Sequence, residues 1–168
     1  MYNNEIKITL ALTLLACSIF LFYSGEIGYG IVVLIIMGLV ILSIFKDERI
    51  VKAFYHLRKN DMQKAASTLS KIKHPEKLIR SQEAYYYYLN GLILSQTQMN
   101  QSERFFKKAL SIGLRTDTDK AVAKLNLAGL AMSRRKKREA TTLITEAKKL
   151  DKHNMLDEQL KMMKQQLK

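Results

Sequence analysis

A pattern of apolar residues that recurs three times between residues 65 and 147 constrains the fold more than any other feature of the sequence. In each copy a small residue is followed four positions later by a larger apolar residue, and three positions after that by another apolar residue. The copies begin at Ala65, Ser102 and Ala140, which are 37 and 38 residues apart. Their later members are Leu69 with Ile72, Phe106 with Ala109, and Ile144 with Ala147. Self-similarity at such a period is typical of repeated supersecondary units.

The composition indicates that these units are helical. The 168 residues include only seven glycines and one proline, whereas leucine, lysine, alanine and glutamine are abundant. These residue types favour helix, and no strand pattern is present beyond the first fifty residues. The sequence therefore predicts an all-α protein.

The repeats resemble the tetratricopeptide repeat (TPR), a helix–turn–helix unit. The third copy, residues 121–154, has the family's length of 34 residues without a gap. Leu127, Ala128 and Ala131 stand at the places of the family's Leu, Gly and Tyr. The second copy matches the family pattern through Tyr86, Leu89 and Ile93. The chain departs from the family where Arg49 and Lys124 replace a large aromatic residue and Asn90 replaces a glycine.

This resemblance implies a short α-solenoid of about three helix pairs, with repeats at about 47–79, 83–116 and 121–154. The first repeat matches mainly through its turn, residues 59–65. A one-sided apolar stripe then predicts a capping helix over residues 155–167. The stripe consists of Leu156, Leu160, Met163 and Leu167. A generic helical bundle is the alternative architecture.

Two apolar runs near the start predict a membrane hairpin of residues 1–46, followed by the TPR-like domain of residues 47–168. The runs predict spans at about 7–23 and 27–45, and the second has the length that a bilayer core requires. A cleaved signal peptide is the alternative for the first run. Only Lys7 precedes that run against Glu5, no small-residue cleavage site follows it, and a longer run begins within four residues.

The charge distribution predicts the topology of such a hairpin. The connection at 24–26 has no Lys or Arg, whereas Lys46, Arg49 and Lys52 follow the second run. The positive-inside rule then places both termini and the TPR domain in the cytoplasm, with a multi-pass protein in the cell (inner) membrane. Since charges balance in residues 1–46, the net charge of +13 lies on the remainder.

Four consecutive tyrosines in the segment "EAYYYYLNG" cannot all face one core, because they cover most of a helix circumference. The resemblance implies that Tyr86 packs, Tyr85 faces the preceding repeat, Tyr87 faces a concave groove and Tyr88 lies at its edge. A protein-binding groove for a peptide or an amphipathic helix is the expectation. Its predicted members are Tyr87, Tyr88, Gly91, Leu94, Ser95, Leu125, Asn126, Gly129 and Met132. Burial of these residues by the first repeat or the capping helix is an equally open alternative.

A basic patch occupies the turn within the third repeat. It consists of Arg134, Arg135, Lys136, Lys137 and Arg138. Such a run is usually a solvated turn, but the basic domain around it also suits an acidic protein, anionic lipid or ribosomal RNA. No RNA-recognition motif and no interleaved aromatic residues accompany it, which argues against sequence-specific reading of nucleic acid.

Signals for catalysis are missing from the sequence. His56, His74 and His153 are scattered, Cys17 is the single cysteine, and no phosphate-binding loop or nucleophile motif is present. We therefore expect no enzyme, no cofactor and no metal. The predicted function is that of a membrane-anchored TPR adaptor or scaffold that presents a protein-binding groove to the cytosol. The alternatives are electrostatic docking of ribosome, RNA or anionic lipid, and an accessory subunit of a larger membrane complex.

Overall fold

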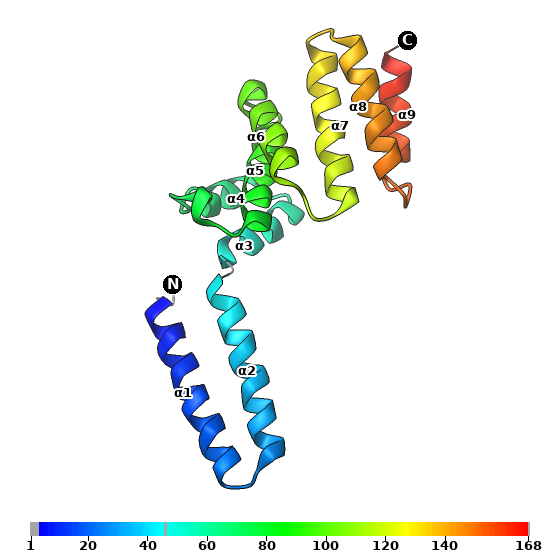
Figure 1. Cartoon of the computed structure of the whole chain (residues 1–168). Coiled ribbons are helices and arrows are strands. Elements are labelled where there is room, and N and C mark those ends of the chain that lie inside the picture. The colour runs from blue at the N-terminus through cyan, green and yellow to red at the C-terminus, as the bar shows by residue number, and fades with distance from the viewer. Residues whose placement is uncertain (1–3, 46, 168) are drawn as a thin grey trace. The chain divides into compact units, whose positions relative to one another are not determined.

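The computed structural model describes residues 4–45 and 47–167, which form α-helices, one 3-10 turn and no strand (Figure 1). The chain divides into two compact units, residues 1–47 and 48–168. The first unit is a hairpin of α1 (Asn4–Tyr23) and α2 (Ile27–Phe45). The helices of the second unit are α3 (Glu48–Arg58), α4 (Met62–Leu69), η1 (Pro75–Lys77), α5 (Arg80–Leu94), α6 (Met99–Ile112), α7 (Asp117–Ser133), α8 (Lys137–Leu150) and α9 (Asp157–Gln166).

The hairpin closes through a tight turn and one close helix approach. Gly25 has a φ of +80°, a conformation that glycine adopts without strain. The buried hydroxyl of Ser18 donates to the Gly30 carbonyl at 3.3 Å, and a Cβ at Gly30 would lie only 3.1 Å from the Phe22 ring. Small residues therefore let α1 and α2 approach each other here.

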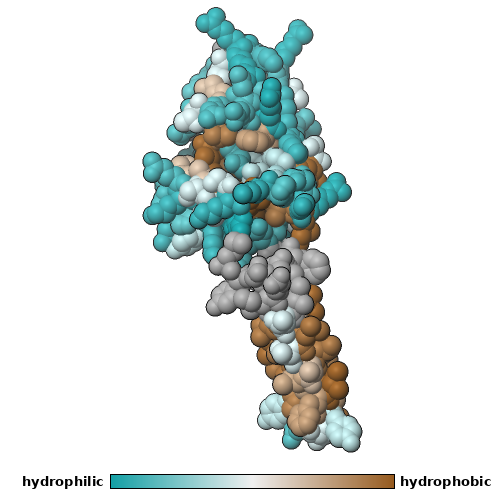
Figure 2. Space-filling view, turned by 90° about the vertical axis from the view of Figure 1, so that its left-hand side faces the viewer, coloured by the Kyte–Doolittle hydropathy of each residue, from teal (hydrophilic) through white to brown (hydrophobic). Residues whose placement is uncertain are grey.

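The outward side of the hairpin is apolar. Large side chains on both helices are well exposed, including Leu12, Phe20, Ile35 and Leu39. Figure 2 shows the resulting hydrophobic surface over the hairpin. Within the described residues, however, no helix combines the length and the apolar character needed to cross a membrane. The two predicted spans are thus not confirmed.

The second unit consists of successive helix pairs, α3 with α4, α5 with α6 and α7 with α8, followed by α9. Asn60 and Arg135 each adopt a positive φ in the connection within a pair, and each precedes the small residue of its repeat by five positions. The N-terminus of α4 is capped by Asp61, whose carboxylate accepts from the Lys64 amide at 3.1 Å. The first and third pairs therefore share a turn geometry as well as a sequence pattern.

All nine residues of the recurring pattern are buried. They lie in or beside two hydrophobic clusters. The larger cluster joins α3, α4, α5 and α6 with one face of α7 and includes Leu69, Leu89 and Phe106. The smaller cluster joins the other face of α7 with α8 and α9 and includes Leu125, Ile144 and Leu160. The all-α architecture with repeated helix pairs is thus confirmed at this level.

The four residues of the predicted capping stripe contact α7 and α8. Leu156 and Leu160 are buried in the smaller cluster, and Met163 and Leu167 pack against it. The connection from α8 is held by Asp151, whose carboxylate accepts from the amides of Met155 at 3.0 Å and Leu156 at 2.7 Å. In Figure 1 α7, α8 and α9 accordingly lie side by side.

Candidate functional site: the tyrosine helix, the basic turn and the α3 face

Two of the four consecutive tyrosines on α5 face α6. Tyr88 is 4% exposed and meets the Phe106 ring edge-on, with 6.2 Å between the ring centroids. Tyr87 is 8% exposed, and its hydroxyl lies 2.6 Å from the ammonium of Lys108, which also sits over the Tyr87 ring. These rings therefore hold the second helix pair together.

Tyr85 connects α5 to the start of α7. Its hydroxyl donates to the Asp119 carboxylate at 2.5 Å, and that carboxylate also accepts from the Thr116 hydroxyl at 2.6 Å. Thr116 in turn caps α7 by accepting from the Asp119 amide at 3.1 Å. Tyr86 is half-buried, with its ring edge-on to Tyr87. The tyrosine run thus mainly connects α5 to its neighbours α6 and α7.

Several members of the predicted protein-binding groove are buried. Tyr87, Tyr88 and Gly91 are buried against α6, because Gly91 rather than Asn90 lies at the closest approach of the pair. A Cβ at Gly91 would come within 2.9 Å of the Phe106 ring, and the Ser102 hydroxyl donates to the Gly91 carbonyl at 2.8 Å. Residues three and four positions before Gly91 must then point the same way.

Helix α9 covers the third-repeat members of the same predicted groove. Leu125 is buried with Leu156 and Leu160, Met132 packs against that cluster, and a Cβ at Gly129 would lie 3.8 Å from the methyl carbon of Met163. For these residues the structure shows the alternative that the sequence left open, in which the capping helix covers them. The remaining predicted members are half-buried and accessible: Leu94, Ser95 and Asn126.

The contacts of Tyr85 and Tyr88 predict that the stability of the folded domain depends on pH. Burial and the neighbouring Asp119 carboxylate raise the pKa of Tyr85 from 10.0 to about 12, and burial also raises the pKa of Tyr88. A raised pKa favours the neutral phenol, so this stabilisation is complete below pH 10.0 and is lost as the pH rises through about 12. We expect the midpoint of thermal unfolding to fall across this range, and less steeply in Tyr85→Phe. Ionisation of all tyrosines near pH 10 in the folded protein, followed by phenolate absorbance, would contradict this.

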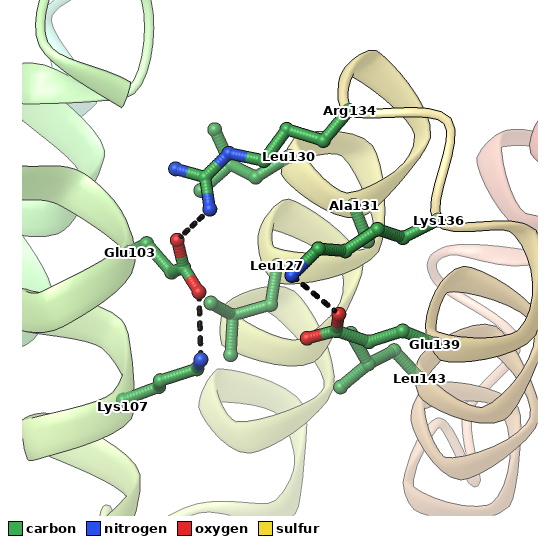
Figure 3. Close-up of a pocket in the computed structure, with 9 residues that line it drawn as sticks. All are labelled: Glu103, Lys107, Leu127, Leu130, Ala131, Arg134, Lys136, Glu139 and Leu143. Carbon is green, nitrogen blue, oxygen red and sulfur yellow. Dashed lines mark hydrogen bonds and ion pairs between the residues drawn. The ribbon is translucent and has the colours of Figure 1, made fainter. Parts of the chain in front are cut away.

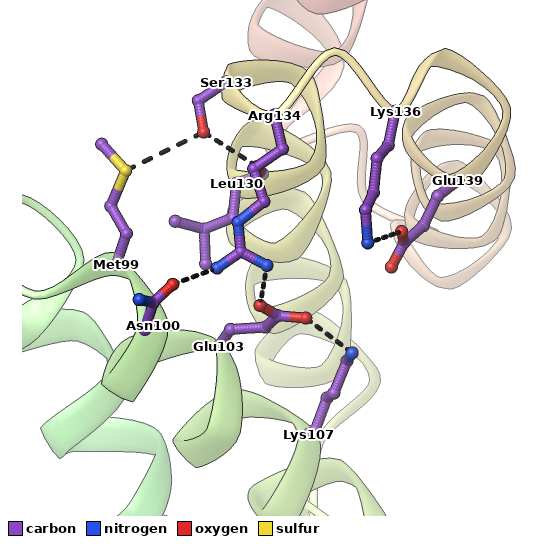
Figure 4. A network of polar contacts seen from close by, with 9 residues as sticks. All are labelled: Met99, Asn100, Glu103, Lys107, Leu130, Ser133, Arg134, Lys136 and Glu139. Carbon is purple, nitrogen blue, oxygen red and sulfur yellow. Dashed lines mark hydrogen bonds and ion pairs between the residues drawn. The ribbon is translucent and has the colours of Figure 1, made fainter.

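Two of the five cations in the basic turn between α7 and α8 form ion pairs. Arg134 pairs with Glu103 and donates to the Asn100 side chain at 2.6 Å, while Lys136 pairs with Glu139 at 3.4 Å (Figure 4). Glu103 also accepts from Lys107 at 2.6 Å, and these two cations, Lys107 first, lower the pKa of Glu103. The other three cations of the run are exposed and make no ion pair with any residue that the structure describes: Arg135, Lys137 and Arg138.

A small pocket lies beside this turn, between α6, α7 and α8 (Figure 3). Its floor is apolar and consists of Leu127, Leu130, Ala131 and Leu143. Its rim carries the ionic network, with Glu103 and Lys107 on α6 and Arg134, Lys136 and Glu139 on the opposite side. Sequence reasoning missed the pocket because the rim comes from residues of two different repeats.

Helix α3 presents a second surface that sequence reasoning missed. Val51, Phe54 and Tyr55 are 66%, 47% and 54% exposed, although their neighbours Ile50 and Ala53 are buried in the core. Their spacing of three and four positions, which places them on one helix face, was the available signal.

The described residues offer no constellation for metal chemistry. Within 4–45 and 47–167 no group of three or more His, Cys, Asp or Glu side chains could hold an ion. His74 instead pairs with Glu76 at 2.9 Å on an exposed surface, and Cys17 is exposed on α1.

Comparison of the chain with protein-family models, with curated proteins and with solved structures finds no match.

Proposed function

We propose that the chain is a membrane-anchored adaptor whose TPR-like helical repeats recruit a protein partner. The observation that carries the proposal is the threefold burial of the same small and large residues in successive helix pairs, closed by α9. Units of this kind contact mainly their neighbours and leave extended surfaces free for binding. The resemblance of residues 121–154 to the TPR pattern supports the same reading.

The apolar exterior of the hairpin supports the anchoring. Phe20, Ile35 and Leu39 are each at least 60% exposed, and soluble proteins rarely expose large continuous apolar surfaces. The cations that follow α2, together with their absence from residues 24–26, favour a cytoplasmic repeat domain. Burial of these side chains in lipid would give the hairpin its function.

The partner surface that we propose is the pocket between α6, α7 and α8. Its apolar floor lies beside exposed cations on the α7–α8 turn, so an acidic segment with an apolar anchor is complementary in both respects. The predicted groove has lost too many members to burial to serve this role by itself. Among its members only Leu94, Ser95 and Asn126 are neither buried nor covered by α9.

Leu143→Glu should abolish recruitment, because Leu143 is half-buried on the pocket floor and a carboxylate there would repel an acidic partner. The full chain would be crosslinked in intact membranes, purified in mild detergent and compared with the variant by mass spectrometry. A stoichiometric protein that survives high salt and nuclease and is absent from the variant is the expected result. Equal recovery at an unchanged thermal midpoint would contradict the pocket assignment.

Electrostatic docking is a second candidate, favoured by the three cations of the basic turn that pair with no described residue. If it holds, the triple variant Arg135→Glu, Lys137→Glu, Arg138→Glu should weaken binding to ribosomes or anionic vesicles by roughly tenfold or more, with a shallower salt dependence. Since the variant removes no ion pair among the described residues, its thermal midpoint should match that of the wild type. Unchanged binding and an unchanged salt slope would eliminate this candidate.

A further inference from the structure

The exposed face of α3 has the composition of a helix that lies in a membrane interface. Val51, Phe54 and Tyr55 share one face, and Arg58 continues it one turn further along. The opposite face packs into the larger cluster through Ile50 and Ala53. The apolar side of α3 that points away from the core is thus not explained by folding of the domain.

Cations border this apolar face. Lys59 lies 4.5 Å from the centroid of the Tyr55 ring, and Lys52 and Arg58 are accessible beside it. Lys52 reaches Glu48 at 3.6 Å, but both side chains are more than 60% exposed, so the pair is weak. An apolar face with tyrosine at its edge and Lys and Arg beside it is typical of helices on anionic membranes.

The position of α3 in the chain supplies the third argument. The helix begins at Glu48, and α2 ends at Phe45. Three residues span at most about 11 Å, whichever way the two units turn. The headgroup region on one side of a bilayer is about 5–8 Å thick, so a hairpin inserted up to Phe45 keeps the start of α3 at the interface.

We propose that α3 lies on the cytoplasmic membrane surface, with Val51, Phe54 and Tyr55 in the interfacial layer and its cations at anionic lipid headgroups. This inference rests on the anchoring under the proposed function. Its consequence is that the first helix pair is held against the bilayer, instead of hanging from a free linker.

The absence of tryptophan from the sequence makes a direct test possible. Phe54→Trp and, as a matched control, Met155→Trp would each place one fluorophore at an exposed position of the full chain. Both variants would be reconstituted into phosphatidylcholine vesicles with and without phosphatidylglycerol, containing lipids brominated near the headgroup. Circular dichroism would confirm that both are folded.

In the Phe54→Trp variant we expect brominated lipid to quench the indole emission roughly twofold and the spectrum to be blue-shifted, since interfacial side chains lie at the headgroup–acyl boundary. The Met155→Trp variant should show neither change. Replacing Lys52, Arg58 and Lys59 with Gln in the Phe54→Trp background should reduce quenching more in the anionic vesicles than in the neutral ones.

Three outcomes would overturn the inference in distinguishable ways. Unquenched emission from a Phe54→Trp variant that resists alkaline carbonate extraction would reject the interfacial helix while leaving the anchoring intact. Extraction by carbonate would reject both. A blue shift in the Phe54→Trp variant without quenching would mean that a protein surface, including a second copy of the chain, covers α3.

Discussion

Replacing Phe106 with alanine should lower the free energy of unfolding of the helical domain by about 3–5 kcal/mol. The ring is fully buried, meets Tyr88 edge-on and lies directly against Gly91. Its removal leaves a cavity that Gly91 has no side chain to fill. Urea unfolding of the full chain in detergent, followed by the near-ultraviolet tyrosine signal, measures the effect.

The neighbouring Phe105 provides the matched control. It is half-buried on the same helix, beside the Tyr87 ring at a centroid distance of 5.9 Å. Truncation there removes the same atoms from a site that water already reaches. Phe105→Ala should therefore lower the free energy of unfolding clearly less than Phe106→Ala. Equal losses for the two variants would mean that α5 and α6 do not pack as described.

Leu160→Ala should destabilise the end of the domain by about 2–5 kcal/mol. Leu160 is 1% exposed and packs in the smaller cluster with Leu125 and Ile144, so its loss leaves a cavity between α9 and the last helix pair. Differential scanning calorimetry would detect the loss as a lower unfolding midpoint or as an earlier, separate transition.

Met162→Ala tests the same helix on its exposed side. Met162 is 55% exposed, and substitutions at such sites usually change stability by less than about 0.5 kcal/mol. A large effect there, or none at Leu160, would show that α9 docks through a different face. In that case the part of α7 that α9 covers in this structure would be accessible to solvent.

The buried core of the second helices could be predicted from spacing alone. Ala65, Ser102 and Ala140 recur with their larger neighbours because each closes a helix pair at the same depth. A period of repeated residues reports packing directly, since every copy solves the same steric problem. The confirmed helix-pair architecture follows from that periodicity.

The face of α5 could not be predicted in the same way. Gly91 lies 11 residues before Ser102, whereas Ala128 lies 12 before Ala140, so alignment to the family pattern places Asn90 where Gly91 belongs. A shift of one position turns a helix by about 100°. That rotation carries Tyr87 and Tyr88 from the expected groove into the interface with α6.

The accessible surfaces escaped prediction for a different reason. Coverage of Leu125 and Gly129 depends on how far α9 reaches back over α7, which the apolar stripe on α9 does not specify. The pocket beside Arg134 combines residues from α6 and α8 that no local pattern connects. Local sequence determines which side of a helix is buried, but the neighbouring helix determines how much of it.

Helix α7 belongs to both hydrophobic clusters, with Leu127 and Leu130 in one and Leu125 and Ala128 in the other. Most of its length is covered on both sides, so α7 is the helix through which the two hydrophobic clusters meet. A domain arranged this way can gain or lose a helix pair at α7, because an added helix pair before Asp117 would meet apolar partners on both sides. Chains of this architecture can therefore differ in the number of helix pairs, and so in the length of the helical domain, while the two ends stay the same.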